Sequence, residues 1–378
     1  MPCNDLTVPQ SQTAIVQRHE KQGFQNTLPL SIANDVAVPA LSSAYDVLVR
    51  VLAVALNHCD YKMVTNFPSP GNMAGCDFCG TIIDRGSSAM CERGARVCGG
   101  VFPYGRESHS AKESGAFSEF LTVDSRLLLR VPDSWSDLEG AALGGVGWGT
   151  AGLAISGSDA LALAGFPSEL AAEPEPVLIY GGATATGTMA CQLLKLSGYA
   201  PITLTSPQSA VLAMEYGASQ TSSYISPACA ESVRTFAVVP IRHALDCITS
   251  AESVATCFAA LARTGGRYAC LESLQDNWRT RRAVRVKEVM GYESLGRNIV
   301  LGSEDGTEST YTRKANPALA ALCARWAIEM QKLLDAGLIK HHPIREVAGQ
   351  WEGIIDGLMT LQRGEVRGQK LVLRIAEG

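Results

Sequence analysis

Short apolar runs alternate with amphipathic segments between residues 177 and 271. Four runs have the length and composition of buried strands: Val177–Tyr180, Pro201–Thr205, His243–Ile248 and Arg267–Leu271. Helical patterns at 209–216 and 251–262 separate some of them, and glycines follow both. This alternation predicts a parallel sheet with helices on both faces, which is an α/β doubly wound fold.

The residues before this region follow a different pattern. Asp46–Leu56 alternates as strands do, and Ile82–Gly86 and Ala116–Val123 are further strand candidates in a mostly-β region. Near the end, helices are predicted at 317–336 and 351–363, followed by a closing strand at Gln369–Arg374. We therefore predict three parts: a mostly-β part at 1–155, the doubly wound domain at 156–302, and a C-terminal segment at 303–378 that completes the first domain.

A glycine-containing turn follows the first of the four runs. The segment Val177-Leu-Ile-Tyr-Gly-Gly-Ala-Thr-Ala-Thr-Gly187 is typical of a strand, a tight turn and a helix whose N-terminal N–H groups hold a pyrophosphate. The spacing departs from G-x-G-x-x-G, so the domain could instead bind another ligand. We predict a dinucleotide site whose residues are Gly181, Gly182, Thr184, Ala185, Thr186 and Gly187.

The end of the second predicted strand distinguishes between dinucleotides. An Asp or Glu there usually binds a free ribose 2′-hydroxyl, but the sequence is Thr203-Leu-Thr-Ser206. Hydroxyls accommodate a 2′-phosphate that a carboxylate would repel, so NADPH is favoured over NADH. The alternative is that Thr205 and Ser206 only start a turn before Pro207. The predicted cofactor set is completed by Ser206, Ser209 and Tyr224.

Composition limits the class of protein. The 378 residues are 46% hydrophobic and 18% charged, with a formal net charge of −5, as in an ordinary enzyme and unlike a nucleic-acid binder. Met1–Gln12 has no apolar core typical of a secretory signal. Ala141–Ile155 is too short and glycine-rich to span a bilayer. We expect a cytoplasmic protein that binds neither nucleic acid nor membrane.

The chain has 12 cysteines. Several lie in apolar runs, where cysteine acts as a small hydrophobe, so reduced thiols are expected. Cys76 and Cys79 have metal-binding spacing, but Cys91 and Cys98 do not form the second close pair that a structural zinc site needs. No metal site is predicted.

Several motifs, in order along nearly the whole chain, resemble the medium-chain dehydrogenase/reductases. Besides the Gly181–Gly187 turn, they are Leu56-Asn-His-Cys-Asp-Tyr-Lys62, Gly75-Cys-Asp-Phe-Cys-Gly80, Gly147-Trp-Gly-Thr-Ala-Gly-Leu153 and Gly368-Gln-Lys-Leu-Val-Leu. The resemblance implies a GroES-like catalytic domain and a Rossmann domain that binds a nicotinamide cofactor. Zinc-dependent members have Cys in place of Asn57 and Gly-His-Glu in place of Gly75-Cys-Asp77, so this chain resembles the zinc-free quinone oxidoreductase and enoyl reductase branch.

Within that branch, further motifs resemble the trans-acting enoyl reductases of fungal highly reducing polyketide synthases of the lovastatin, tenellin and aspyridone type. They include Tyr45-Asp-Val-Leu-Val-Arg, Leu193-Leu-Lys-Leu-Ser-Gly-Tyr199, Ala244-Leu-Asp-Cys-Ile-Thr-Ser250 and His341-His-Pro343. The resemblance implies NADPH-dependent reduction of an α,β-unsaturated acyl thioester on the acyl carrier protein of a partner synthase, by a monomeric enzyme. A free-standing quinone or alkenal reductase and a non-catalytic NADPH-binding protein remain alternatives.

The resemblance also implies three candidate catalytic residues. Lys62 is the candidate for polarising the carbonyl or donating a proton, against the alternative of a solvated lysine that begins a helix. Thr150 is the candidate contact on the nicotinamide side, against the alternative of a helix cap. Asn57 belongs to the same motif as Lys62, although it could serve only to bond the backbone.

One basic segment suggests a docking surface for the carrier protein. Five of the ten residues from Trp278 to Lys287 are basic: Arg279, Arg281, Arg282, Arg285 and Lys287. A carrier protein is typically acidic and its prosthetic arm bears a phosphate, so a basic surface would speed encounter. The alternative is an ordinary solvated face.

Overall fold

The computed structural model describes residues 8–18, 28–105, 114–301, 309 and 311–376. Cys3, one of the cysteines considered above, lies outside this part. The chain divides into two compact units. Unit 1 comprises Met1–Val146, Asn298–Ala315 and Pro343–Gly378, and unit 2 comprises Gly147–Arg297 and Asn316–His342.

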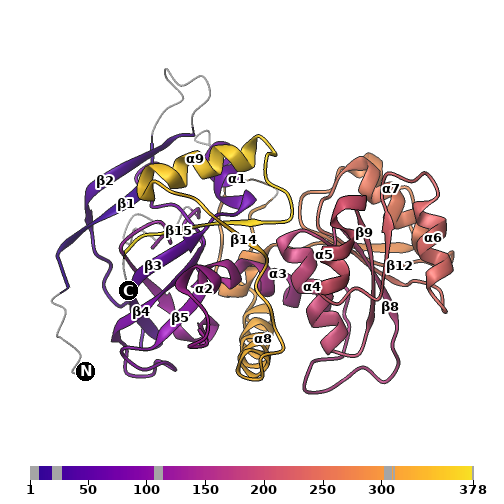
Figure 1. The fold of residues 1–378 in the computed structure, drawn as a ribbon, viewed down its shortest axis with the longest axis horizontal. Helices are drawn as coiled ribbons and strands as arrows, with labels where there is room; N and C mark the ends of the chain where they lie inside the picture. Colours follow the sequence, from indigo (N-terminus) through magenta and orange to yellow (C-terminus); the bar gives the residue numbers. More distant parts are fainter. Residues whose placement is uncertain (1–7, 19–27, 106–113, 302–308, 310, 377–378) are drawn as a thin grey trace. The chain divides into compact units, whose positions relative to one another are not determined.

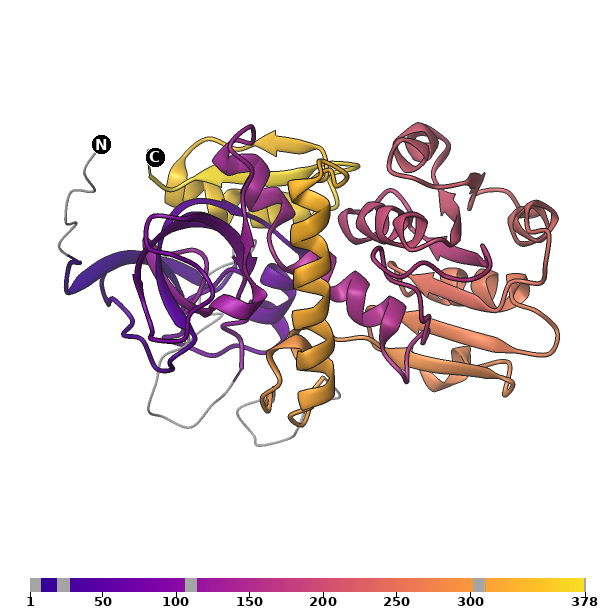
Figure 2. The same cartoon turned by 90° about the horizontal axis from the view of Figure 1, so that it is seen from below.

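Unit 1 is built mainly on antiparallel strand pairs, and β14 and β15 form a parallel pair. Within the described residues, its larger sheet has seven strands in the order β14-β15-β3-β4-β5-β7, with β6 also paired to β3. The bounds are β3 Asp46–Ala55, β4 Asp77–Arg85, β5 Arg96–Gly100, β6 Phe120–Asp124, β7 Leu129–Arg130, β14 Ile344–Glu346 and β15 Lys370–Arg374. β1 (Ser11–Gln17) pairs with β2 (Leu30–Ala37). Figure 2 shows the indigo and purple strands of this unit curving round one another.

The central strand β3 explains why the C-terminal segment returns to this unit. Nine of its ten residues are buried, because β4, β6 and β15 all pair with it. β15 continues the sheet at Val372–Arg374, which confirms the predicted closing strand. The helices of the unit are α1 (His58–Asn66), α2 (Asp137–Leu143), α9 (Gln350–Gln362) and the 3₁₀ turn η1 (Ser125–Leu127).

Unit 2 is the predicted doubly wound domain. Within the described residues it holds a six-stranded sheet in the order β10-β9-β8-β11-β12-β13, and every pairing is parallel (Figure 1). Its strands are β8 Pro176–Tyr180, β9 Ala200–Thr205, β10 Gln220–Ser223, β11 His243–Asp246, β12 Gly266–Cys270 and β13 Val284–Glu288. The four predicted strands are thus confirmed as β8, β9, β11 and β12.

Helices complete unit 2. They are α3 Val146–Ser156, α4 Ala185–Leu196, α5 Ala210–Glu215, α6 Cys229–Phe236, α7 Ala251–Ala260 and α8 Pro317–Asp335, with 3₁₀ turns η2 Pro207–Ser209, η3 Asp276–Trp278 and η4 Gly291–Leu295. Leu204, Phe258 and Tyr268 belong to one buried cluster that β9, α7 and β12 share. The inner strands β8, β9, β11 and β12 are largely buried because helices cover the sheet, whereas the edge strands β10 and β13 are more polar.

The units are bounded differently from the parts predicted from the sequence. Residues 303–378 were expected to complete the first domain, but α8 belongs to unit 2, as does nearly all of α3. Glu329 of α8 accepts hydrogen bonds from the backbone N and Oγ of Ser168, at 3.0 and 2.7 Å. The rings of Trp326 and Phe166 pack with their centroids 4.8 Å apart. The hydrophobic pattern along the chain does not reveal these contacts between α8 and residues 166–168.

Across the described part of the chain, no helix combines the length and apolar character needed to cross a membrane.

Candidate functional site

The predicted glycine turn joins β8 to α4 in unit 2. Gly181 has φ +80°, a backbone conformation that suits glycine, and it directly follows β8. A Cβ on Gly187 would lie 2.2 Å from the carbonyl oxygen of Gly181, so only glycine fits there. Gly182 is similarly restricted by Thr203, which a Cβ would approach to 2.6 Å. The glycines therefore bring the turn close against the strand ends.

Thr184 has a specific role in this turn that the sequence did not reveal. It is the N-cap of α4, and its Oγ1 accepts a hydrogen bond from the backbone N of Gly187 at 3.0 Å. Ala185 and Thr186 are the first two residues of the helix, and both are half-buried. The helix N-terminus is therefore formed and partly accessible, which suits an anionic group.

The other predicted cofactor residues follow the neighbouring strands. Ser206 comes directly after β9, and its Oγ donates to the Oγ of Ser209 at 2.9 Å. Tyr224 comes directly after β10, and its backbone N donates to the carbonyl of Thr205 at 3.1 Å. The ring of Tyr224 stacks on that of Tyr180, with centroids 5.8 Å apart and planes at 20°. All these residues therefore gather at the carboxyl edge of one parallel sheet, where ligands of this fold class bind.

The loop after β11 also reaches this edge, and the sequence analysis missed it. A Cβ on Gly181 would lie 3.0 Å from Ile248, which places the loop against the glycine turn. Asp246 Oδ1 accepts the backbone N–H groups of Ile248 and Thr249, both at 2.9 Å. Thr249 has φ +60°, which is strained for a β-branched residue. The sequence feature that could have indicated this loop is Asp246, an aspartate near the end of a predicted buried strand.

Asp246 is itself buried among neutral donors. Its Oδ2 accepts hydrogen bonds from Ser253 Oγ at 2.5 Å and from Tyr268 OH at 2.8 Å. Burial raises the pKa of this carboxyl, and the hydrogen bonds oppose that change.

In unit 1, Asn57 belongs to a buried polar network at the start of α1. Its Nδ2 donates to Asp77 Oδ2 at 2.9 Å, and its Oδ1 accepts from Lys370 Nζ. Lys370 Nζ also pairs with Asp77 Oδ2 at 2.9 Å. Asp77 Oδ1 accepts the backbone N–H groups of Gly145 and Val146, at 2.8 and 2.9 Å. Both polar atoms of the Asn57 amide are therefore bonded inside the network, which favours a positioning role over contact with a substrate.

Lys62 and Thr150 lie in different units. Lys62 is the fifth residue of α1 and is half-buried, so it does not begin the helix as the alternative interpretation required. Thr150 is the fifth residue of α3 and is 7% exposed, so it is not a helix cap. A Cβ on Gly291 would lie 2.4 Å from Thr150 Oγ1, so a glycine is needed beside this hydroxyl.

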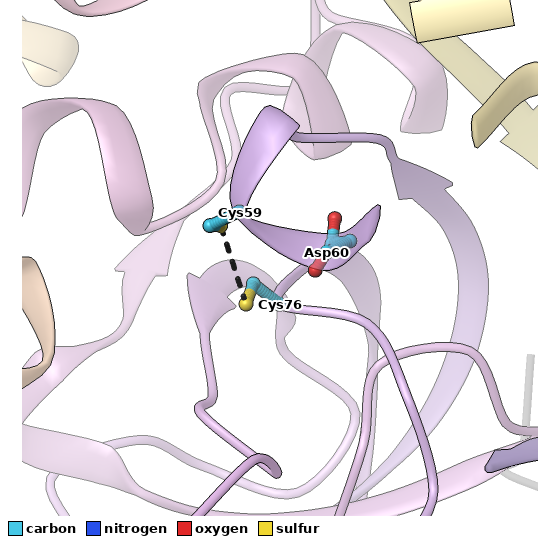
Figure 3. Close-up of side chains that lie close together, drawn as sticks. All are labelled: Cys59, Asp60 and Cys76. Carbon is cyan, nitrogen blue, oxygen red and sulfur yellow. Dashed lines mark hydrogen bonds between the residues drawn. The ribbon is translucent and has the colours of Figure 1, made fainter. Parts of the chain in front are cut away.

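Two cysteines and an aspartate gather at the first turn of α1, which carries Cys59 and Asp60 (Figure 3). Cys59, Asp60 and Cys76 are the one group of possible metal ligands found in the part of the chain that the structure describes. Cys79, which shares metal-binding spacing with Cys76, instead lies opposite Cys98 in the β4–β5 pairing. The described cysteines are all free thiols.

Asp60 is the buried centre of this group. Its Oδ2 accepts from the backbone N of Asn57 and its Oδ1 accepts from Tyr104 OH, both at 2.8 Å. Burial raises the pKa of the Asp60 carboxyl to about 6, although these hydrogen bonds and one from Cys76 oppose the increase. The Tyr104 hydroxyl in turn accepts the backbone N–H of Gly75 at 2.8 Å.

The basic segment proposed for docking is only partly available. The Arg281 guanidinium donates to the backbone carbonyls of Phe258, Leu261, Ala262 and Arg263, so it holds the end of α7. Lys287 pairs with Asp159 at 2.7 Å. Arg279, Arg282 and Arg285 are exposed. Arg279 lies 4.0 Å from Asp276, and Arg285 lies on the edge strand β13. The Arg281 guanidinium is therefore engaged by the fold, which favours the exposed arginines as the docking residues.

Comparisons with known proteins agree with this architecture. A family model of the alcohol dehydrogenase GroES-like domain matches residues 43–133. The crystal structure of a putative zinc-dependent alcohol dehydrogenase protein from Rhizobium etli has a TM-score of 0.73 at 19% identity, covering 98% of this chain and 100% of the other. This similarity shows the fold alone.

Curated relatives have a much higher sequence identity to this chain than that solved structure has. The trans-enoyl reductase calK of Penicillium decumbens is 51% identical, covering 97% of this chain and 98% of its own length. The trans-enoyl reductase sthE of Phaeosphaeria nodorum is 52% identical over the same shares. The chain therefore belongs to the trans-enoyl reductases, a group of oxidoreductases with the medium-chain dehydrogenase/reductase fold.

Proposed function

We propose that this chain reduces the carbon–carbon double bond of an α,β-unsaturated acyl thioester, using NADPH, while the acyl group is attached to the carrier protein of a partner polyketide synthase or synthase–peptide synthetase hybrid. The observation that carries the proposal is identity of 51–52% to two curated trans-enoyl reductases over nearly the whole chain. The medium-chain fold indicates a nicotinamide cofactor, and the choice of NADPH rests on the residues described next.

The carboxyl edge of the unit 2 sheet fits a phosphorylated dinucleotide. The glycine turn and the N-terminus of α4 would hold the pyrophosphate through backbone N–H groups. At the end of β9 stand the hydroxyls of Thr205 and Ser206, with Ser209 beside them and no carboxylate among these positions. We assign the 2′-phosphate to Ser206 and Ser209, and the Tyr180–Tyr224 stack to the adenine side.

NADPH, when bound, supplies a hydride to the β-carbon of the substrate. The residues of this chain must then hold the thioester carbonyl, whose oxygen gains negative charge, and provide a proton for the α-carbon. We assign the first task to the Lys62 ammonium, which has three donors. We assign Thr150 to the nicotinamide side, and Asn57 to bracing the start of α1.

The central experiment is NADPH oxidation by the purified chain with a crotonyl thioester and, separately, with a simple enone. The proposal expects turnover of the thioester and a clear preference for it. Comparable turnover of the simple enone would favour a free-standing quinone or alkenal reductase. Binding of NADPH without oxidation on either substrate would contradict the proposed enzyme.

The carrier protein is expected to meet the exposed arginines of unit 2. Arg279, Arg282 and Arg285 are exposed and remain as docking candidates, since Arg281 and Lys287 are engaged within the unit. The double variant Arg282→Glu/Arg285→Glu should slow reduction of carrier-bound substrate and leave the small thioester unaffected. The variant Lys314→Glu/Arg363→Glu changes the net charge equally at exposed positions of unit 1. Equal slowing by both variants would contradict a local docking surface.

A further inference from the structure

Two thiols from separate segments of unit 1 lie side by side. Cys59 Sγ and Cys76 Sγ are 3.9 Å apart (Figure 3). Cys59 is the second residue of α1 and is half-buried, whereas Cys76 directly precedes β4 and is 1% exposed. Neither thiol has a part in the chemistry proposed above.

We propose that Cys59 and Cys76 form a redox-active dithiol, which closes to a reversible disulfide and then links α1 to β4. The sulfur atoms are close to van der Waals contact at 3.9 Å, so a disulfide of about 2.05 Å needs them to approach by only about 2 Å. Cys59 is partly exposed and Cys76 is buried. That arrangement suits an attacking thiol and a resolving thiol.

The oxidant is a small-molecule disulfide such as glutathione disulfide. The Cys59 thiolate attacks one of its sulfur atoms, so a mixed disulfide forms and one glutathione leaves as the thiolate. Cys76 then attacks Cys59 Sγ, the mixed disulfide breaks, and the second glutathione leaves. The chain loses two electrons and two protons, and glutathione disulfide gains two electrons to become two glutathione molecules.

Asp60 is placed to accept the proton of Cys76 in the second step. The Cys76 thiol hydrogen-bonds to its carboxylate, and burial has made that carboxylate more basic than an ordinary aspartate. The hydrogen bond with Cys59 and burial raise the pKa of Cys76 well above its usual value. Cys76 therefore rests as a thiol, and a local base is needed before it attacks.

The same three side chains could instead be considered as ligands of a metal ion. The contacts of Asp60 oppose this, since its two carboxylate oxygens already accept from the Asn57 backbone and from Tyr104. A metal ion would have to share these oxygens with two hydrogen-bond donors and replace the hydrogen bond from the Cys76 thiol. The two sulfur atoms can form a disulfide with both of these bonds intact.

Formation of the disulfide would restrict the movement of α1, the helix that carries the proposed catalytic residue Lys62. Lys62 lies three residues after Cys59 on α1, so a covalent link in the first turn constrains the segment that presents it. We expect oxidised protein to turn over the crotonyl thioester several-fold more slowly, with recovery in dithiothreitol. This consequence for activity rests on the proposed function; formation of the disulfide does not.

Peptide mapping tests the disulfide directly. The purified full-length chain is equilibrated with glutathione disulfide, alkylated and digested with trypsin without reduction. Cleavage after Arg50, Lys62 and Arg85 puts Cys59 in Val51–Lys62, and Cys76 with Cys79 in Met63–Arg85. We expect a cross-link between these two peptides that reducing agent removes.

A pair of matched variants assigns the sulfur atoms. Cys76→Ala should abolish the cross-link and leave Cys59 as a stable mixed disulfide with glutathione. Cys79→Ala, at a buried cysteine of the same peptide, should keep the cross-link. Loss of the link only in Cys79→Ala, or glutathionylation of Cys59 beside a free Cys76 in the unmodified chain, would overturn the proposal. A cross-link in a protein inactive with NADPH would leave it standing and count against the proposed function alone.

Discussion

The two units each use a buried aspartate to hold a loop, but they neutralise it differently. Asp77 in unit 1 accepts two consecutive backbone N–H groups through Oδ1, and Asp246 in unit 2 does the same. The other oxygen of Asp77 meets the ammonium of Lys370, which is 6% exposed. The other oxygen of Asp246 accepts, among the described residues, from the hydroxyls of Ser253 and Tyr268.

This difference indicates which property of the aspartate, its charge or its ability to accept hydrogen bonds, each loop requires. A buried ion pair binds its segments together, but loss of one partner leaves an uncompensated charge in the interior. Neutral hydroxyl donors can rotate to accept as well as donate, so they tolerate a change at the carboxyl group. Unit 1 is therefore sensitive to any change in the charge of its network, and unit 2 is sensitive to loss of an acceptor.

Replacing each aspartate by asparagine should distinguish the dependence on charge in unit 1 from the dependence on an acceptor in unit 2, with the largest expected effect. Asp77→Asn leaves the Lys370 ammonium buried without its counter-charge, and we expect a loss of about 3–5 kcal/mol in the free energy of unfolding. Asp246→Asn keeps an acceptor for the loop and leaves hydroxyls that can reorient, so about 1 kcal/mol or less is expected. Denaturant unfolding of the two variants measures both values. Equal losses of unfolding free energy in the two variants would show that the buried Lys370 charge does not make the unit 1 network more sensitive.

A second variant tests whether the cost in unit 1 comes from the unpaired charge. Asp77→Asn/Lys370→Met removes both charges and keeps an oxygen for the N–H groups of Gly145 and Val146. It should recover most of the stability that Asp77→Asn loses, because no buried charge remains. Arg374→Met on the same strand breaks only an exposed pair with Glu346 and should cost no more than about 1 kcal/mol. If the double variant is no more stable than Asp77→Asn, the unpaired ammonium is not the cause.

The third carboxylate, Asp60, should make stability depend on pH. Its pKa is raised from 3.8 to about 6 in the folded chain, so the folded state holds this proton more tightly than the unfolded state. Its contribution is therefore favourable at low pH and is lost as pH rises from 3.8 through about 6. Asp60→Asn should flatten this part of the profile of unfolding free energy against pH. An unchanged profile in the variant would assign the dependence to other groups.

The smallest expected effect concerns the glycine turn. Thr184→Ala removes the cap on α4 and should cost about 1 kcal/mol, whereas Thr186→Ala, inside the first turn, should change the free energy of unfolding by less than about 0.5 kcal/mol. Thermal unfolding without cofactor compares the two. Both variants should weaken NADPH binding in a fluorescence titration, since both residues belong to the proposed site. Equal stability of the two variants would contradict the capping role.

Much of the fold was determined by local pattern. Burial on both faces makes β8, β9, β11 and β12 apolar runs, and that signal needs no knowledge of their neighbours. Gly181 and Gly187 are required by the backbone of the turn itself, so they also could be identified from the sequence. The absence of a carboxylate after β9 was equally visible, since it is a property of consecutive residues.

Tertiary structure alone decided how distant segments combine. Lys370 reaches Asn57 across 313 residues, and Cys59 meets Cys76 from a separate segment, because the sheet of unit 1 brings β15 and β4 beside β3. Arg281 belonged to a basic segment in the sequence, but the end of α7 takes its guanidinium. Periodicity records whether a residue is buried, and it carries no information about which partner satisfies a buried polar group; that depends on where the chain returns.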